Sequence, residues 1–192
     1  LLELRCLGPF QATVGQSEIT WRTIKARDLL AYLIHHRGRP VTKEKIVEAI
    51  WPDMDPEHSF SLFHTNLYQL RKVVKAAMGN YQLVKLSSGQ YFLNLDQISC
   101  DTDQFEQLVR LTKPEKLKNQ PEEELNALQK AVSLYRGDYL EGLDYPWLET
   151  ERERLNRICL SLLDRLARSY LQLGKPDLAI SCLQSILSDN PL

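Results

Sequence analysis

The stretch that most constrains the fold of this chain is SFSLFHTNLYQLRKVVKAAMG, at residues 59–79. Its large apolar residues recur at steps of three, four, three and four, which is the period of one buried stripe on a helix. These residues are Phe60, Phe63, Leu67, Leu70 and Val74, and the stretch contains no carboxylate. We therefore expect a long amphipathic helix, with a buried side that fixes its position and an outer side that is polar and cationic.

The outer side of this helix carries polar side chains. At about 100° per residue, it carries Ser61, Thr65, Gln69 and Lys72, with Tyr68 beside them. Gln pairs bidentately with adenine N6 and N7, and Thr offers a hydroxyl to a base or a methyl to thymine. Thr65 and Gln69 lie one turn apart, so both can reach one groove floor, and we predict that this side of the helix reads DNA bases. The alternative is that they are ordinary solvated polar residues.

Long cations and a phenol at the edge of the same face suit the phosphate backbone, because they reach it without reading sequence. These residues are Tyr68, Arg71, Lys72 and Lys75. Arg71 lies nearer the buried stripe, so an intramolecular salt bridge is its alternative role. No acidic residue occurs between His58 and Leu95. This charge pattern fits a nucleic-acid partner, and a solvated face with chance clustering is the equal alternative on charge alone.

The order of elements around this helix predicts a winged helix-turn-helix. The first 20 residues alternate apolar and polar, which indicates two or three short antiparallel strands. Thr23, Thr42 and Asp55 are the predicted N-caps of three successive helices, the last with Pro56 at its first position. A hairpin follows, in which YQLVKL and YFLNL flank a four-residue loop at residues 87–90. Strands, three helices and a hairpin are the order of that fold.

Two further positions are predicted to lie near DNA in this arrangement. Thr42 and Lys43 open the second helix, whose N-terminal amides can meet a phosphate. Ser87 and Ser88 form the tip of the wing.

The second half of the chain is predicted to be helical throughout. One segment fits the tetratricopeptide pattern, in which small residues let two antiparallel helices approach and a glycine turns between them. Its residues are Leu163, Ala167, Tyr170, Gly174, Ala179, Leu183, Ile186 and Pro191. Ala127, Ala131 and Leu134 repeat part of that spacing. Generic packing in a helical bundle is the alternative interpretation.

The predicted fold class is therefore α+β and predominantly α. Residues 1–98 are assigned to a winged helix-turn-helix with an N-terminal antiparallel sheet and a C-terminal hairpin wing, and we expect them to fold by themselves. Residues 99–192 are assigned to an all-α, tetratricopeptide-like domain. Residues 1–98 contain twelve Lys and Arg residues and nine Asp and Glu residues. Residues 99–192 contain twelve Lys and Arg residues and sixteen Asp and Glu residues, so the two parts differ in the sign of their net charge. The chain begins without methionine and stops just after a helical pattern, so we expect a fragment of a longer protein.

Four motifs in order carry a family resemblance: ARDLLAYLIHHRGRPVTKEKIVEAIWPD, NLYQLRKVV, SSGQYFLNL and YPWLETERERL. Residues 1–98 resemble the effector domain of OmpR/PhoB-type regulators, and residues 99–192 resemble the bacterial transcriptional activator domain. Together they resemble the DNA-binding core of a Streptomyces antibiotic regulatory protein (SARP)-type activator. In that family arginine is common where Gln69 stands, and wing residues are often basic where Ser87 and Ser88 stand, so base preference cannot be copied across.

The resemblance implies that the chain has DNA and RNA polymerase as partners, and it implies which segments contact each of them. It implies that the long helix enters the major groove, that the wing lies near the minor groove, and that a homodimer binds direct repeats of double-stranded DNA. It also implies recruitment of RNA polymerase, with Asp53 and Met54 in the loop before the long helix facing the polymerase. The other hypothesis is a protein-interaction scaffold whose winged helix has lost DNA binding.

Other classes are disfavoured by the sequence. We find no catalytic constellation, so we expect no enzyme and no cofactor. The histidines, at positions 35, 36, 58 and 64, lack same-face spacing, and the four cysteines form no CxxC pair, so no metal site is expected. The cysteines are interpreted as reduced packing residues. No apolar run approaches a membrane span. We expect a cytoplasmic protein with no membrane partner.

Overall fold

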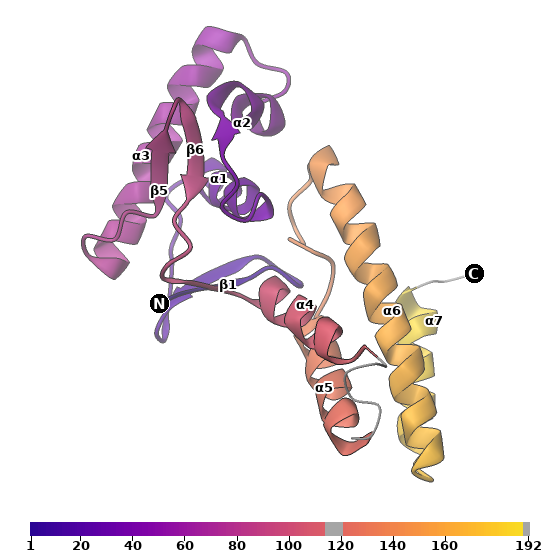
Figure 1. The fold of residues 1–192 in the computed structure, drawn as a ribbon. Coiled ribbons are helices and arrows are strands. Elements are labelled where there is room, and N and C mark those ends of the chain that lie inside the picture. Colours follow the sequence, from indigo (N-terminus) through magenta and orange to yellow (C-terminus); the bar gives the residue numbers. More distant parts are fainter. Residues whose placement is uncertain (114–120, 190–192) are drawn as a thin grey trace. The chain divides into compact units, whose positions relative to one another are not determined.

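The computed structural model describes residues 1–113 and 121–189, and its ribbon is drawn in Figure 1. The chain divides into two compact units that each include a short segment from the other half of the sequence. The first unit comprises Leu1–Arg5, Phe10–Cys100 and Gly142–Trp147. The second unit comprises Cys6–Pro9, Asp101–Glu141 and Leu148–Leu192. Residues 142–147, here called the strap, therefore belong to the first unit although helical segments of the second unit flank them in the sequence.

The first unit has the predicted order of strands, three helices and a hairpin. Its elements are β1 (Leu2–Arg5), β2 (Gln11–Val14), β3 (Ser17–Glu18), α1 (Ile24–His35), β4 (Val41–Thr42), α2 (Lys43–Ile50), α3 (Pro56–Met78), β5 (Val84–Ser87), β6 (Gln90–Leu93) and β7 (Ile98–Cys100). One sheet has the strand order β3-β2-β1-β7 and the other β4-β6-β5. The N-terminal antiparallel strands are confirmed. Strand β7, which pairs parallel to β1, and the short β4 were not predicted.

All three predicted helix caps are confirmed. The side chain of Thr23 accepts a hydrogen bond from the amide of Ala26 at 3.2 Å, and that of Thr42 accepts one from Lys45 at 3.4 Å. The carboxylate of Asp55 accepts one from His58 at 3.1 Å. Each cap satisfies a backbone donor that the first turn of a helix leaves open.

Most of the predicted stripe on α3 forms the core of the first unit. Phe63, Leu67, Leu70 and Val74 are buried, and the ring of Phe63 lies 5.0 Å from that of Tyr91 on β6. The expectation that Phe60 is core is wrong, because Phe60 is only half-buried. Phe60 lies in the second turn of α3, and the ammonium of Lys43 stands 4.0 Å above its ring. This is a cation–π contact at the margin of the core.

A buried asparagine joins α3 to the start of α1. Asn66 is 5% exposed, and its Oδ1 accepts a hydrogen bond of 2.6 Å from the hydroxyl of Thr23. Its Nδ2 donates to the carbonyl of Leu62 at 2.8 Å. Thr23 therefore caps α1 and anchors it to α3 through one hydroxyl. The sequence signal for this contact is a polar residue in the interior of a helix, one position from the apolar stripe.

Replacing Asn66 with alanine is expected to lower the free energy of unfolding by about 1–3 kcal/mol, because the Thr23 hydroxyl loses its buried acceptor. Chemical denaturation followed by circular dichroism measures this loss. Asn80→Ala is the matched control, since Asn80 is exposed beyond the end of α3. Equal stability of the two variants would show that the Asn66 contact contributes nothing.

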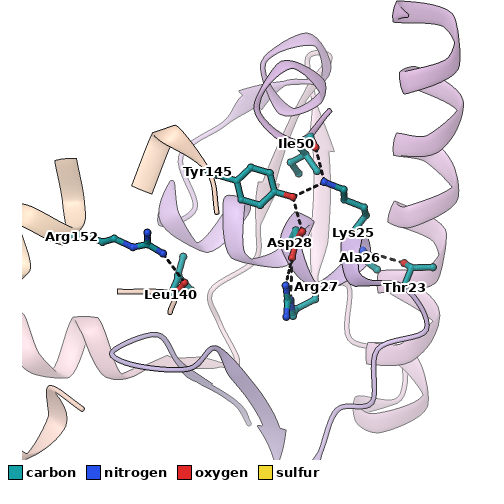
Figure 2. Close-up of polar contacts among 9 residues, drawn as sticks. All are labelled: Thr23, Lys25, Ala26, Arg27, Asp28, Ile50, Leu140, Tyr145 and Arg152. Atoms are coloured by element: carbon teal, nitrogen blue, oxygen red, sulfur yellow. Dashed lines mark hydrogen bonds and ion pairs between the residues drawn. The ribbon is translucent and has the colours of Figure 1, made fainter. Parts of the chain in front are cut away.

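The strap is held to the first unit by a buried polar network, shown in Figure 2. The hydroxyl of Tyr145 donates to Asp28 Oδ2 at 2.6 Å, and Lys25 Nζ donates to the same hydroxyl at 2.8 Å and to the carbonyl of Ile50 at 2.9 Å. Arg27 donates twice to Asp28 Oδ1, at 3.0 and 2.8 Å. Asp28 is 3% exposed, so these donors satisfy a carboxylate that water does not reach.

Apolar contacts complete the attachment of the strap. Leu143 and Tyr145 are buried, and the Trp147 ring lies 5.1 Å from Tyr32 and 5.0 Å from His35 on α1. Burial, and then the hydrogen bond to Asp28, raise the pKa of Tyr145 above its usual value. The strap is therefore an integral part of the first unit.

The second unit is helical, as predicted, with α4 (Asp101–Leu111), α5 (Pro121–Leu134), α6 (Glu149–Gln172) and α7 (Pro176–Asp189). A 3₁₀ turn, η1 (Pro146–Leu148), precedes α6. Helices α6 and α7 pack side by side (Figure 1), and Gly174 turns between them at φ 68°. Tyr170 and Ala179 are buried, as the tetratricopeptide pattern requires, and the hydroxyl of Tyr170 accepts a hydrogen bond from Gln129 of α5 at 2.8 Å. Leu183 is 44% exposed, and Pro191 lies outside the described residues.

All four cysteines are buried and none forms a disulfide, which agrees with the expected packing role. Within residues 1–113 and 121–189, no helix combines the length and the apolar character that crossing a bilayer requires.

Candidate nucleic-acid interface

Helix α3 presents the predicted DNA-binding face. It begins at Pro56 after the Asp55 cap and ends at Met78, and the φ of 68° at the following residue, Gly79, favours glycine. Most of the predicted contact residues on this helix are exposed: Ser61, Thr65, Tyr68, Arg71, Lys72 and Lys75. Its only carboxylate, Glu57, lies in the first turn. The exposed face beyond that turn therefore carries cations, hydroxyls and amides without a competing negative charge.

Two side chains on this face interact within the helix. The hydroxyl of Thr65 donates to the carbonyl of Ser61 at 3.0 Å, which leaves its lone pairs and its methyl group for a ligand. The ammonium of Lys72 lies 5.8 Å from the centre of the Tyr68 ring, and Tyr68 is 60% exposed. Tyr68 and Lys72 therefore occupy one edge of the face together.

Gln69 lies at the margin of the face. It is half-buried, and its Oε1 is buried without a hydrogen-bond partner in the part of the chain that the structure describes. A bidentate contact with adenine uses both the oxygen and the nitrogen of the amide. Such a contact therefore requires Oε1 to turn out of its buried position.

Arg71 makes a hydrogen bond in place of the salt bridge considered from the sequence. Its Nη2 donates to the carbonyl of Val84 at 3.0 Å, and within the described ranges no carboxylate pairs with it. This bond ties α3 to β5 at the start of the wing. The other donors of the guanidinium remain available, since arginine carries five N–H groups.

The wing is tighter than predicted. The expected four-residue loop is wrong, because Ser87 and Gln90 pair across the hairpin and only Ser88 and Gly89 connect the strands. Both connecting residues have positive φ, 50° and 75°, which is the backbone of a type I′ turn. Ser87 and Ser88 are exposed at the tip. Lys85 lies 3.9 Å from the carboxylate of Asp96, so the only lysine of the hairpin is partly neutralised.

The residues at the start of α2 make more contacts within the protein than the sequence indicates. Thr42 uses its hydroxyl as the cap of α2, and its backbone pairs with Gln90 of the wing. Lys43 lies over Phe60, as described above, and both Thr42 and Lys43 are half-buried. By contrast, Asp53 and Met54 in the loop before α3 are exposed.

The histidines at the end of α1 are packing residues. The His36 ring lies 4.7 Å from the Tyr32 ring, edge to face. Burial, followed by the charges of His35, Arg39 and Lys45, lowers the pKa of His36 to about 4. A neutral imidazole at neutral pH fits this apolar contact.

Two family models match this chain in the predicted order. The model described as "Transcriptional regulatory protein, C terminal" matches residues 17–91, and the model described as "Bacterial transcriptional activator domain" matches residues 100–192. The chain belongs to the SARP-type bacterial transcriptional activators. The first match covers α1, α2, α3 and the wing up to Tyr91, and the second begins at the end of β7. Both models describe transcriptional regulators, which are not enzymes.

Relatives of this SARP-type chain are regulators as well. It is 26% identical over 191 residues to regulatory protein AfsR of Streptomyces coelicolor, a match that covers 100% of this chain and 19% of AfsR. It is 24% identical to transcriptional regulatory protein MoaR1 of Mycobacterium tuberculosis, over 99% of this chain and 62% of MoaR1. The chain therefore spans less than two thirds of these relatives.

A solved structure has the same fold. Mycobacterium tuberculosis EmbR, in complex with a low-affinity phosphopeptide, superposes with a TM-score of 0.83 at 23% identity, over 99% of this chain and 51% of that one. The winged helix-turn-helix followed by a helical domain is thus the fold of this SARP-type chain.

Proposed function

We propose that the chain binds double-stranded DNA sequence-specifically, with α3 in the major groove and the wing tip near the minor groove. The observation that carries this proposal is the exposed face of α3. It offers Tyr68, Arg71, Lys72 and Lys75, and no acidic residue follows on the chain until Asp96. Phosphate attraction supplies most of the affinity of such a face, and it needs cations without nearby carboxylates.

The exposed side chains divide into two roles in this proposal. Tyr68, Arg71, Lys72 and Lys75 contact phosphate, since each combines length with a donor. Ser61, Thr65 and Gln69 face the base edges. Thr42, Lys43, Ser87 and Ser88 are assigned to the backbone beside α3, because Thr42 pairs with Gln90 of the wing and Lys43 lies over Phe60 of α3.

We further propose that a homodimer occupies direct repeats and recruits RNA polymerase in the cytoplasm. Residues 1–98 are the proposed DNA-binding domain and residues 99–192 the proposed activator domain. Sixteen acidic residues against twelve basic ones in the latter disfavour extensive DNA contact. Asp53 and Met54 are assigned to the polymerase, because an acidic and apolar pair repels phosphate. Further domains of the same longer chain are also proposed partners.

Lys72→Ala is expected to weaken binding to all duplexes about equally. It should reduce the slope of log affinity against log salt by about 0.9 for each phosphate that the variant no longer neutralises. Fluorescence anisotropy across a salt series measures the slope. Lys130→Ala is the matched control, since Lys130 is an exposed lysine on α5. An unchanged slope for Lys72→Ala would remove Lys72 from the interface.

The double change Asp53→Ala and Met54→Ala is expected to abolish transcriptional activation and to leave DNA affinity within about twofold, because both side chains are exposed and neither caps a helix. A promoter reporter and a binding titration measure the two effects. Asp55 is left unchanged, since its carboxylate caps α3. A parallel loss of DNA affinity would contradict the assignment of this loop to the polymerase.

The alternative function is a protein-interaction scaffold that no longer binds DNA. Two features favour it: the buried Oε1 of Gln69 and the uncharged tip of the wing. A scaffold predicts no measurable affinity for any duplex at low salt. The DNA-binding proposal predicts at least non-specific binding under the same conditions.

A further inference from the structure

A cavity of about 700 Å³ lies within the second unit and has no role in the proposed DNA contacts. It is bounded by the end of α5, the loop that follows, the middle of α6 and one residue of α7. This volume falls within the range of small-molecule sites in proteins. Its walls are polar in the loop and apolar where Val132, Cys159 and Leu163 line it.

Hydrogen-bond acceptors without partners gather on this wall. Asp138 and Glu141 line the cavity from the loop after α5, and neither carboxylate has a hydrogen bond or an ion pair in the described part of the chain. Across from the loop, on α6, Asn156 Oδ1 is buried and has no hydrogen-bond partner among the described residues. The two carboxylates are exposed at the cavity, whereas the buried Asn156 Oδ1 is a costly unsatisfied acceptor, which a donor from outside the chain satisfies when the site has room.

Arg136, the positively charged residue in the cavity wall, is paired with a carboxylate of the protein. Arg136 donates to Asp101 Oδ2 at 2.7 Å, and the carboxylate of Asp101 also accepts the amides of Cys6 at 2.7 Å and Leu7 at 3.2 Å. Arg136 therefore neutralises a buried carboxylate outside the cavity. The charge left facing the cavity is negative, from Asp138 and Glu141.

Gly137 sets the position of one of these carboxylates. The Oε2 atom of Glu141 lies so close to the Gly137 Cα that a Cβ at residue 137 would overlap it. The backbone of Gly137 does not have positive φ, so alanine is allowed there by conformation. The absence of a side chain at residue 137 therefore lets Glu141 lie against the loop.

We propose that this cavity binds a guanidinium group carried on an alkyl stem. A guanidinium offers five N–H donors in a planar fork and no acceptor, which matches two carboxylates and an amide oxygen. The stem lies against Val132, Cys159 and Leu163. The group can belong to a small molecule such as agmatine or to an arginine side chain of a peptide. This proposal is independent of the proposed DNA binding.

Calorimetric titration of the 192-residue chain with agmatine and with an acetylated, amidated arginine tripeptide tests the proposal. We expect at least one of them to bind with a dissociation constant of about 1 mM or tighter. Binding of agmatine indicates a small-molecule ligand, and binding of the tripeptide alone indicates a peptide. Binding of neither at 10-fold higher concentrations, about 10 mM, overturns the proposal.

Three variants locate the binding. Glu141→Gln is expected to weaken it about 10-fold or more, because a charge-assisted hydrogen bond becomes a neutral one. Gly137→Ala keeps the charge but displaces the carboxylate, so it should weaken binding similarly. Glu123→Gln, an exposed acid on α5 away from the cavity, should have no effect. Thermal melts verify folding, and equal affinity of a folded Glu141→Gln or Gly137→Ala variant and the unchanged chain overturns the assignment.

Discussion

Tyr145→Ala is expected to lower the free energy of unfolding by about 3–5 kcal/mol, the largest effect of any single change considered for this chain. The substitution removes a buried aromatic ring from the strap and also the hydroxyl that donates to Asp28. Asp28 is 3% exposed and would keep only the bonds from Arg27. Chemical denaturation followed by tryptophan fluorescence measures the loss, since Trp147 lies in the strap.

Two tyrosine variants separate the causes of this effect. Tyr145→Phe keeps the ring and should cost about 1–3 kcal/mol, the contribution of the hydroxyl to a buried charged partner. Tyr68→Ala is the matched control, because Tyr68 is 60% exposed, and it should change stability by less than about 0.5 kcal/mol. If Tyr145→Ala were no less stable than Tyr68→Ala, the strap would contribute nothing to the first unit.

The strap also changes what can be expected of a truncated chain. A chain that ends at residue 98 lacks Leu143, Tyr145 and Trp147, so the faces of Tyr32 and Asp28 that they cover become exposed. We therefore expect residues 1–98 alone to be markedly less stable than the first unit within the full chain. A truncated chain that melts at the same temperature as the full chain would contradict the role of the strap.

Gln69→Ala is expected to cost about 1–3 kcal/mol on the best DNA site and to relax preference at one or two base pairs. The salt slope should stay nearly unchanged, because the amide is neutral. The stability of the fold should not fall, since the substitution removes a buried oxygen that has no partner in the described residues. Binding titrations on the preferred duplex and on a scrambled one measure the selectivity. Thr65→Ala should show a smaller effect at a neighbouring pair.

An equal loss of affinity on both duplexes would give Gln69 a different role. The residue would then contact the backbone or support the helix, and the base-reading role of this part of α3 would be wrong.

The local elements could be predicted because their signals are local. The caps Thr23, Thr42 and Asp55 act within a few residues, and the structure confirms them. The periodicity of α3 is also a local signal, and all of its predicted stripe except Phe60 is buried. The tight wing was missed because Ser88 adopts positive φ, which is uncommon for a residue other than glycine. A pattern of alternating residues does not fix which pair closes the hairpin.

The long-range contacts could not be predicted because they join residues far apart in the sequence. Nothing near Tyr145 indicates that its hydroxyl bonds to Asp28, 117 residues earlier. Local periodicity likewise does not indicate that β7 pairs in parallel with β1. In the candidate interface, exposure of Thr65, Tyr68 and Lys72 followed from the helical period, whereas the half-burial of Gln69 depends on how α3 packs against its neighbours.

The central claim is that this chain recognises a DNA sequence, and selection from a pool of random duplexes tests it most directly. The 192-residue chain is incubated with the pool at moderate salt, and the bound fraction is sequenced over successive rounds. We expect enrichment of one motif, present as two copies in the same orientation, and loss of that enrichment at individual base pairs for Gln69→Ala. A bound fraction with the same sequence composition as the starting pool would contradict sequence-specific binding and would favour the scaffold function.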